Sequence, residues 1–182
     1  MKFGNFKAVD DLTMSIKENE IFALLGHNGA GKTTCIYMLT GMLHMTEGHA
    51  ELYGRSVKDD ILEVRKEIGL CQQHDVLYDL VSIKEHLLMT MRIRAGKVDH
   101  QHEQEQINDI LTRCQLHEHK DKLVRQCSGG MKRKLSLGMA LIGQTKTIIL
   151  DEPTSGLDVE SRQQMWDLIR TLKTERSIIM ST

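Results

Sequence analysis

The chain has 182 residues, and its 24 Lys and Arg nearly balance its 25 Asp and Glu, which gives a formal net charge of −1. This length fits one domain, residues 1–182, whose core needs no disulfides, and the near-neutral charge argues against a nucleic-acid partner. No apolar stretch approaches the length of a membrane span, so the chain cannot cross a bilayer alone, and any transport role requires a partner segment.

Short apolar runs alternate with helical patterns along the chain, which is typical of an α/β domain with a mainly parallel sheet. Residues 32–43 follow the first run and predict a helix that ends near Gly41. The runs themselves are expected to be buried strands at residues 21–25, 67–71, 147–150 and 177–180.

Residues 26–33, GHNGAGKT, satisfy every fixed position of the phosphate-binding loop G-x-x-x-x-G-K-[ST]. The glycines let successive N–H groups turn toward phosphate oxygens, Lys32 adds a charge near the outer phosphates, and the Thr33 hydroxyl is placed to ligate Mg²⁺. The alternative is a chance glycine-rich turn. The predicted strand before the loop and the helix after it favour phosphate binding at a helix N-terminus.

The middle third predicts helices and no strand, from about residue 76 to residue 143. Ser82 and Glu85 have the spacing of a capping box at a helix start, and Ala95-Gly96 marks a break before the next helix. The expected organisation is an α/β core at about residues 1–75 and 144–182 with a helical subdomain at about 76–143. Core-facing stripes are predicted for Ile107, Ile110, Leu111 and Cys114, for Leu135, Met139 and Ile142, and for Met165, Leu168, Ile169 and Leu172.

The third strand ends in two acids, Asp151 and Glu152, followed by Pro153. Burying adjacent carboxylates is unfavourable unless a cation or a reacting water uses them, so this strand end is expected to face the nucleotide. Asp151 is then the Mg²⁺ partner through water, and Glu152 polarises the attacking water. An ordinary strand-ending acid pair is the alternative.

Ser128-Gly129-Gly130 begins a helix and offers a second anion-binding N-terminus, far along the chain from the first. If one chain cannot bring both to one nucleotide, a two-fold dimer clamps each ATP between the loop of one chain and the Ser-Gly-Gly of the other. The cluster Lys132-Arg133-Lys134 in the same helix is interpreted as a solvated face.

The four cysteines lack paired spacing and are interpreted as reduced thiols in a cytosolic protein. The nine histidines include the pairs His100/His102 and His117/His119. No set of ligands completes a metal site around these pairs, so solvent-exposed histidines are expected.

With these residues in place, the whole chain resembles the nucleotide-binding domain of an ATP-binding cassette (ABC) transporter. Residues 26–34 are similar to the Walker A motif, 127–131 to the signature motif, 147–152 to the Walker B motif and 155–158 to the D-loop. The resemblance implies a P-loop NTPase core with a helical insertion and an N-terminal antiparallel β portion. It also implies ATP and Mg²⁺ as ligands.

Gln73 matches the Q-loop glutamine, which in the family joins the Mg²⁺ shell. Phe3 matches the aromatic residue that stacks on adenine in the family. Phe6 is close to it in the sequence, and either ring could belong to the core. The resemblance assigns catalytic roles to Glu152, Lys32 and Gln73, and Mg²⁺ ligation to Thr33, Gln73 and Asp151. Nucleotide contacts are assigned to Phe3, Gly26, His27, Asn28, Gly29, Ala30, Gly31, Lys32, Thr33, Thr34, Gln73, Ser128, Gly129, Gly130 and Asp158.

Residues 71–87 and 128–158 most resemble the eukaryotic subfamily A, whose members are mostly lipid transporters. His27 and Gln72 stand where the family often has proline, and Cys127 stands where leucine is commonest. The chain stops at Thr182, before the position of the switch histidine that orients the attacking water in the family. This C-terminal truncation predicts a chain that binds Mg-ATP but hydrolyses it poorly alone, as a fragment, a truncated product or half of a split transporter.

The sequence therefore predicts an ATP-binding and ATP-hydrolysing domain that powers transport, with lipid as a candidate substrate. It is expected at the cytoplasmic face of a membrane, bound to a second such domain and to transmembrane segments that dock around residues 75–78. The alternative for residues 75–78 is an ordinary connecting loop. Two alternatives for function stay open, a soluble ABC ATPase that acts without transport and a remnant that binds ATP with little hydrolysis.

Overall fold

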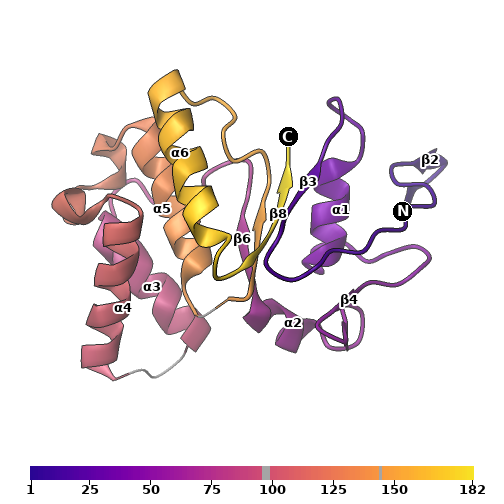
Figure 1. The fold of residues 1–182 in the computed structure, drawn as a ribbon, viewed down its shortest axis with the longest axis horizontal. Coiled ribbons are helices and arrows are strands. Elements are labelled where there is room, and N and C mark those ends of the chain that lie inside the picture. The colour runs from indigo at the N-terminus through magenta and orange to yellow at the C-terminus, as the bar shows by residue number, and fades with distance from the viewer. Residues whose placement is uncertain (96–98, 144) are drawn as a thin grey trace.

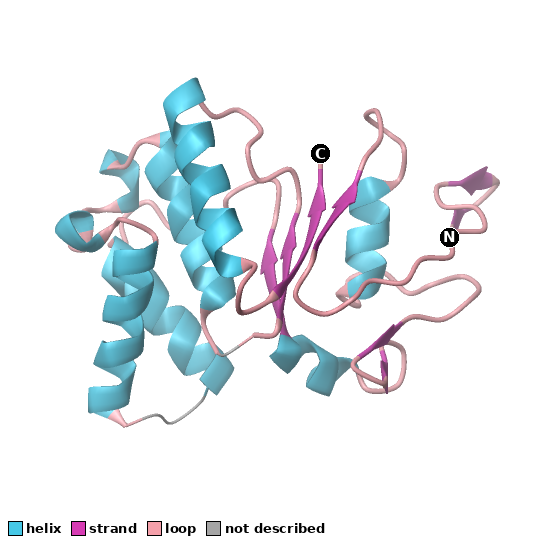
Figure 2. Cartoon of the chain, in the orientation of Figure 1, coloured by secondary structure: helices cyan, strands magenta, loops and turns pink. Residues whose placement is uncertain are grey.

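The computed structural model describes residues 1–95, 99–143 and 145–182, and its centre is a four-stranded sheet (Figures 1 and 2). Every pairing in this sheet is parallel. The sheet order is β3 (Ile21–Leu24), β8 (Ser177–Ser181), β7 (Thr147–Leu150) and β6 (Ile68–Cys71).

Both faces of the sheet are covered by helices, which explains why the central strands read as unbroken apolar runs. On one face, α1 (Lys32–Leu39) and α2 (Ile61–Glu67) pack with Ile149 in one hydrophobic cluster. On the other face, Ile148 and Leu150 join a larger cluster with the remaining helices. Alternate residues of one strand thus serve two cores.

The helices of the second face lie between β6 and β8 in the chain, and they gather on the left of the sheet in Figure 1. The predicted capping box is confirmed, because Ser82 N donates to Glu85 Oε2 at 2.8 Å and Glu85 N donates to Ser82 Oγ at 3.3 Å. The predicted break falls after Ala95, and Gly96 lies outside the described residues. These elements are α3 (Ile83–Ala95), α4 (His100–Arg113), the 3-10 turns η1 (His117–His119) and η2 (Val124–Gln126), α5 (Gly129–Leu141) and α6 (Val159–Leu172).

Two short antiparallel hairpins accompany the parallel sheet. Strands β1 (Lys2–Phe3) and β2 (Phe6–Lys7) pair at the N-terminus, and β4 (Glu51–Leu52) pairs with β5 (Arg55–Ser56). The expected fold class, a P-loop type α/β core with a helical insertion and an N-terminal antiparallel portion, is confirmed. No helix among the described residues is long and apolar enough to span a membrane.

The end of α1 and the burial of β3 differ from the expectation. Helix α1 ends at Leu39, earlier than predicted, because Thr40 caps it and Gly41 follows with φ of 67°. Strand β3 is only half-buried because it forms an edge of the sheet, and Leu25 beyond it is 75% exposed. An apolar run indicates a strand but does not show whether the strand is central.

Candidate functional site

The carboxyl ends of the parallel strands bring the predicted motifs to one edge of the sheet. The 26–31 loop follows β3, Gln73 follows β6, Asp151 follows β7, and Ser181 ends β8. Ligands of open α/β sheets bind at this edge, because the strand ends and the connecting loops form a crevice there.

A cavity of about 400 Å³ opens over the loop at this edge. Its shape depends on Gly31, whose φ is 88° and whose position would place a Cβ 2.3 Å from the carbonyl oxygen of Ala8. Any other residue at this position would clash with the N-terminal segment. The cavity is lined by Phe3, Phe6, Ala8, Asn28, Gly29, Ala30, Gly31, Lys32, Thr33, Thr34, Gln73 and Glu152.

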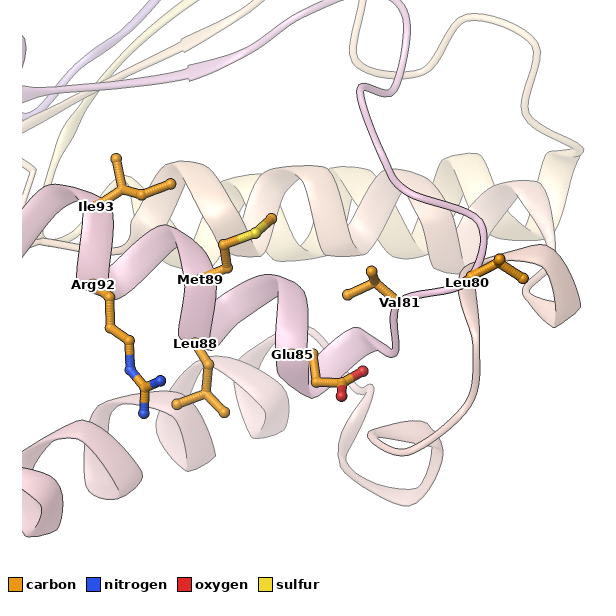
Figure 3. Close-up of a pocket in the computed structure, with 7 residues that line it drawn as sticks. All are labelled: Leu80, Val81, Glu85, Leu88, Met89, Arg92 and Ile93. Atoms are coloured by element: carbon orange, nitrogen blue, oxygen red, sulfur yellow. The ribbon is translucent and has the colours of Figure 1, made fainter.

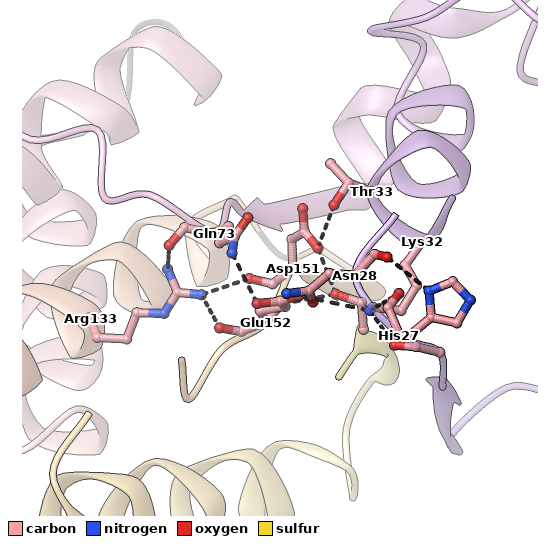
Figure 4. A network of polar contacts seen from close by, with 10 residues as sticks. His27, Asn28, Lys32, Thr33, Gln73, Arg133, Asp151 and Glu152 are labelled. Atoms are coloured by element: carbon pink, nitrogen blue, oxygen red, sulfur yellow. Dashed lines mark hydrogen bonds and ion pairs between the residues drawn. The ribbon is translucent and has the colours of Figure 1, made fainter. Parts of the chain in front are cut away.

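Lys32 folds back over the loop that precedes it (Figure 4). Its Nζ donates to the carbonyls of Gly26 at 2.6 Å and His27 at 3.3 Å, and it lies 3.8 Å from a carboxylate oxygen of Glu152. The ring of His27 bonds in turn to the carbonyl of Asn28 at 2.8 Å. The ammonium is therefore positioned at the cavity, where it can exchange carbonyl partners for phosphate oxygens.

Asp151 lies behind Thr33 and is fully buried. Its Oδ1 accepts a hydrogen bond from Thr33 Oγ1 at 3.3 Å. Its Oδ2 has no partner, and it is the one buried side-chain polar atom left in that state among the described residues. A buried carboxylate oxygen without a partner is unfavourable unless a cation or an ordered water uses it. Because Mg²⁺ takes oxygen ligands and keeps several waters, the pair of Asp151 and Thr33 fits a hydrated Mg²⁺.

Glu152 faces the cavity from the next position. Its carboxylate accepts a hydrogen bond from Gln73 Nε2 at 2.9 Å and lies beside Lys32 (Figure 4). Its backbone has φ of 45°, a left-handed conformation that non-glycine residues seldom adopt. Such a conformation persists only where neighbouring groups hold it.

Two residues that hold this segment escaped the sequence analysis. Ser181, fully buried at the end of β8, donates to Asp151 Oδ1 at 2.6 Å and accepts from the Glu152 N–H at 2.9 Å. Arg133 hydrogen-bonds to main-chain carbonyls of the same segment. The expectation that Lys132-Arg133-Lys134 forms a solvated face is wrong for Arg133 and Lys134, which are 3% and 8% exposed.

The Ser-Gly-Gly segment and the D-loop aspartate lie outside this cavity. Ser128 caps α5 by accepting from the Met131 N–H at 3.2 Å, and Asp158 caps α6 by accepting from the Ser161 N–H at 2.9 Å. The two caps are neighbours, because a Cβ on Gly130 would lie 2.5 Å from Ser161 Oγ. One chain therefore presents these groups as a second cluster.

The histidine expectation is confirmed for the pairs His100/His102 and His117/His119, which are exposed, and wrong for His86. His86 is fully buried and accepts the Tyr78 N–H at 2.9 Å on Nε2, while its Nδ1 lies 2.9 Å from the Ser82 carbonyl. It thus fixes the loop after Gln73 to α3.

Burial raises the pKa of Cys71 to about 11 and that of Cys114 to about 12, so these thiols stay protonated.

A second hollow, of about 540 Å³, lies along α3 next to that loop (Figure 3). Its lining is mainly apolar and includes one acid and one arginine. The lining residues are Leu80, Val81, Glu85, Leu88, Met89, Arg92 and Ile93.

The fold and the glycine loop at the strand ends define an α/β domain of the phosphate-loop class. Its structure is similar to that of the ATP-binding cassette MJ0796, solved as a dimer in a post-hydrolysis state bound to ADP and Pi, with a TM-score of 0.87 and 21% identity over 100% of this chain and 83% of that one. A model of the ABC transporter family matches residues 9–155, and the chain belongs to that family.

The curated relatives include members of subfamily A, as the motifs predict. The chain is 43% identical over 174 residues to the phospholipid-transporting ATPase ABCA3 of Rattus norvegicus, and 45% identical over 180 residues to the glucosylceramide transporter ABCA12 of Homo sapiens. These matches cover 96% and 99% of the chain but only 10% and 7% of the two relatives. The chain thus spans a tenth or less of each relative's length.

Proposed function

We propose that this chain binds Mg-ATP and hydrolyses it as the nucleotide-binding domain of an ABC transporter. The observation that carries the proposal is the unpartnered Oδ2 of buried Asp151, held beside the Thr33 hydroxyl at the rim of the loop cavity. This arrangement would offer oxygen ligands to a cation at the strand end, where it would meet the outer phosphates.

Each residue of the site has a role that follows from its position. The loop N–H groups of residues 26–34 bind the phosphates, with Lys32 as the counter-charge. Thr33, Asp151 and Gln73 would hold Mg²⁺, which supplies charge neutralisation on the phosphates when bound. Glu152, which Gln73 holds in place, orients and polarises the attacking water.

A second copy or a related domain would complete the site. Ser128, Gly129, Gly130 and Asp158 form a cluster apart from the cavity, and the N–H groups of a helix start, here at the exposed Gly129, suit a phosphate brought by a partner. The dimeric state of MJ0796 with bound ADP and Pi supports this assembly. Binding of ATP would close the dimer, and hydrolysis would reopen it.

The transmembrane partner would dock on the loop after Gln73. Val76, Tyr78 and Leu80 are 69%, 61% and 70% exposed, and the apolar hollow on α3 continues this surface. Exposed apolar side chains that adjoin one another mark interaction surfaces. The domain would then sit at the cytoplasmic face of the membrane, and the named activities of the curated relatives favour lipid as the substrate.

The test is a calorimetric titration of the purified protein with ATP in the presence of Mg²⁺. Lys32→Ala removes the counter-charge and is expected to abolish binding or weaken it at least about 100-fold, since charge-assisted contacts to phosphate are the strongest in such a site. Lys66→Ala, at an exposed lysine of α2, is the matched control and should bind as the wild type does. Equal affinity in the wild type and Lys32→Ala would refute the assigned loop.

A further inference from the structure

Arg133 joins the loop after β6 to α5 through a side chain that is only 3% exposed. Its Nη1 donates to the carbonyls of Gln72 and Gln73, the latter at 3.1 Å, and to Asp75 Oδ1 at 3.2 Å. Ser136, one helical turn further on, donates to the same Asp75 oxygen at 2.7 Å. The loop that carries Gln73 is thus fixed to α5 by its backbone.

The same guanidinium binds the end of β7 with its other nitrogens. Nη2 donates to the carbonyls of Asp151 at 2.9 Å and Glu152 at 3.1 Å, and Nε donates to that of Pro153 at 2.9 Å. These carbonyls belong to Glu152 and its two neighbours. The φ of 45° at Glu152 sets the direction of its carboxylate. Figure 4 shows Arg133 on the far side of Glu152 from the phosphate loop.

Only arginine can make this set of contacts. A guanidinium offers five N–H donors in a rigid plane, whereas a lysine ammonium offers three from one point. Removing the arginine would take this donor from the buried contacts to the Asp151 and Pro153 carbonyls and from the partly buried contacts to the Gln72 and Gln73 carbonyls.

We propose that Arg133 is a positioning residue that holds Gln73 and Glu152 at a fixed distance by binding the main chain of both segments at once. The inference deepens the proposed function and rests on it, because it assigns the support for the hydrolytic step. Since α5 begins only a few residues earlier, the same side chain also couples the Ser128-Gly129-Gly130 end of that helix to the catalytic segment.

The test compares Arg133→Lys with Lys134→Met. Lys134 is the matched control, because it is the neighbouring buried cation of α5 and, among the described residues, donates to Gln115 and Gln164, at 3.0 and 2.7 Å, and not to the main chain of either segment. In Arg133→Lys, affinity for ATP without Mg²⁺, which depends on the phosphate loop, should stay within about 3-fold of wild type, while turnover with Mg²⁺ falls on the order of 100-fold, since small misplacements of reacting groups cost this much. Lys134→Met should reduce thermal stability and keep the turnover of the wild type.

Hydrogen exchange of the nucleotide-free protein gives a second, independent reading of the same link. Arg133→Lys should raise amide exchange in residues 72–75 and 151–153 together, and Lys134→Met should not. Turnover of Arg133→Lys equal to that of Lys134→Met, or unchanged exchange in both segments, would overturn the inference. Wild-type protein that neither binds nor hydrolyses ATP would refute the proposed function, while the exchange result would still decide the link.

If Arg133→Lys does not fold, the hydrogen-exchange experiment is made on Asp75→Ala instead. The Asp75 side chain is partly exposed, so its loss spares the core but loosens Arg133. Exchange should then rise at residues 151–153, which lie far from Asp75 in the sequence. Unchanged exchange there would overturn the link.

Discussion

The two walls of the site are built in different ways. The loop wall, residues 26–33, is largely exposed, and several of its polar contacts stay within the loop, as the bonds from Lys32 to the carbonyls of Gly26 and His27 do. The strand wall, Asp151 and Glu152, is buried or half-buried and receives its contacts from distant parts of the chain.

This difference separates the part of the site that can adapt from the part that is pre-organised. The loop can exchange its internal carbonyl contacts for phosphate contacts with little reorganisation elsewhere, because its partners are local. The strand wall cannot move without breaking contacts to Thr33, Ser181 and Arg133. A fixed acid and an adaptable loop suit a reaction that depends on positioning.

The strongest test of the strand wall is Asp151→Asn. Removing this charge should reduce the enhancement of ATP affinity by Mg²⁺ by about 10- to 100-fold, the range seen when metal coordination is disturbed. The free protein should keep or gain thermal stability, because a buried carboxylate with an unpartnered oxygen is replaced by a neutral amide. Titrations with and without Mg²⁺ and a thermal melt measure both effects. Undiminished enhancement by Mg²⁺ would exclude Asp151 from the metal site.

A smaller effect is expected when the strand wall loses one support. Ser181→Ala leaves the Glu152 N–H without its side-chain acceptor and Asp151 Oδ1 with the Thr33 hydroxyl as its remaining donor, which should lower the free energy of unfolding by about 1–3 kcal/mol. Ser15→Ala, at an exposed position, is the control and should unfold at the wild-type denaturant concentration. Equal midpoints for the two variants would show that the wall does not depend on Ser181.

The loop wall can be recognised in the sequence because its signal is local. A phosphate loop is recognised from eight consecutive positions, and Asp151 and Glu152 stand out as acids after an apolar strand. Arg133 and Ser181 carry no such local signal, since their partners are brought together only by the sheet and α5. The best available signal for Arg133 was the apolar character of the residues that follow it, which indicates a helix buried on most sides.

The fold shows the same limit. The four strands of the parallel sheet followed from the apolar runs, but α2, β4 and β5 were not predicted, and the edge position of β3 and the end of α1 depend on the sheet order and on packing against Gly41. His86 was misjudged for the same reason, because its partners Tyr78 and Ser82 make burial of an imidazole possible.

The smallest effect concerns the outer rim of the loop wall, where two rings compete for one role. Phe3 and Phe6 pair across β1 and β2, and both line the cavity, at 48% and 63% exposure. Stacking of a ring on adenine contributes about 0.5–1.5 kcal/mol, so Phe3→Ala should weaken ATP binding by about 3- to 10-fold. Calorimetry with inorganic tripolyphosphate is the control, because a ligand without a base should bind both proteins equally. If ATP affinity falls more in Phe6→Ala than in Phe3→Ala, the adenine contact belongs to Phe6. If a variant loses as much affinity for tripolyphosphate as for ATP, the hairpin supports the loop without touching the base.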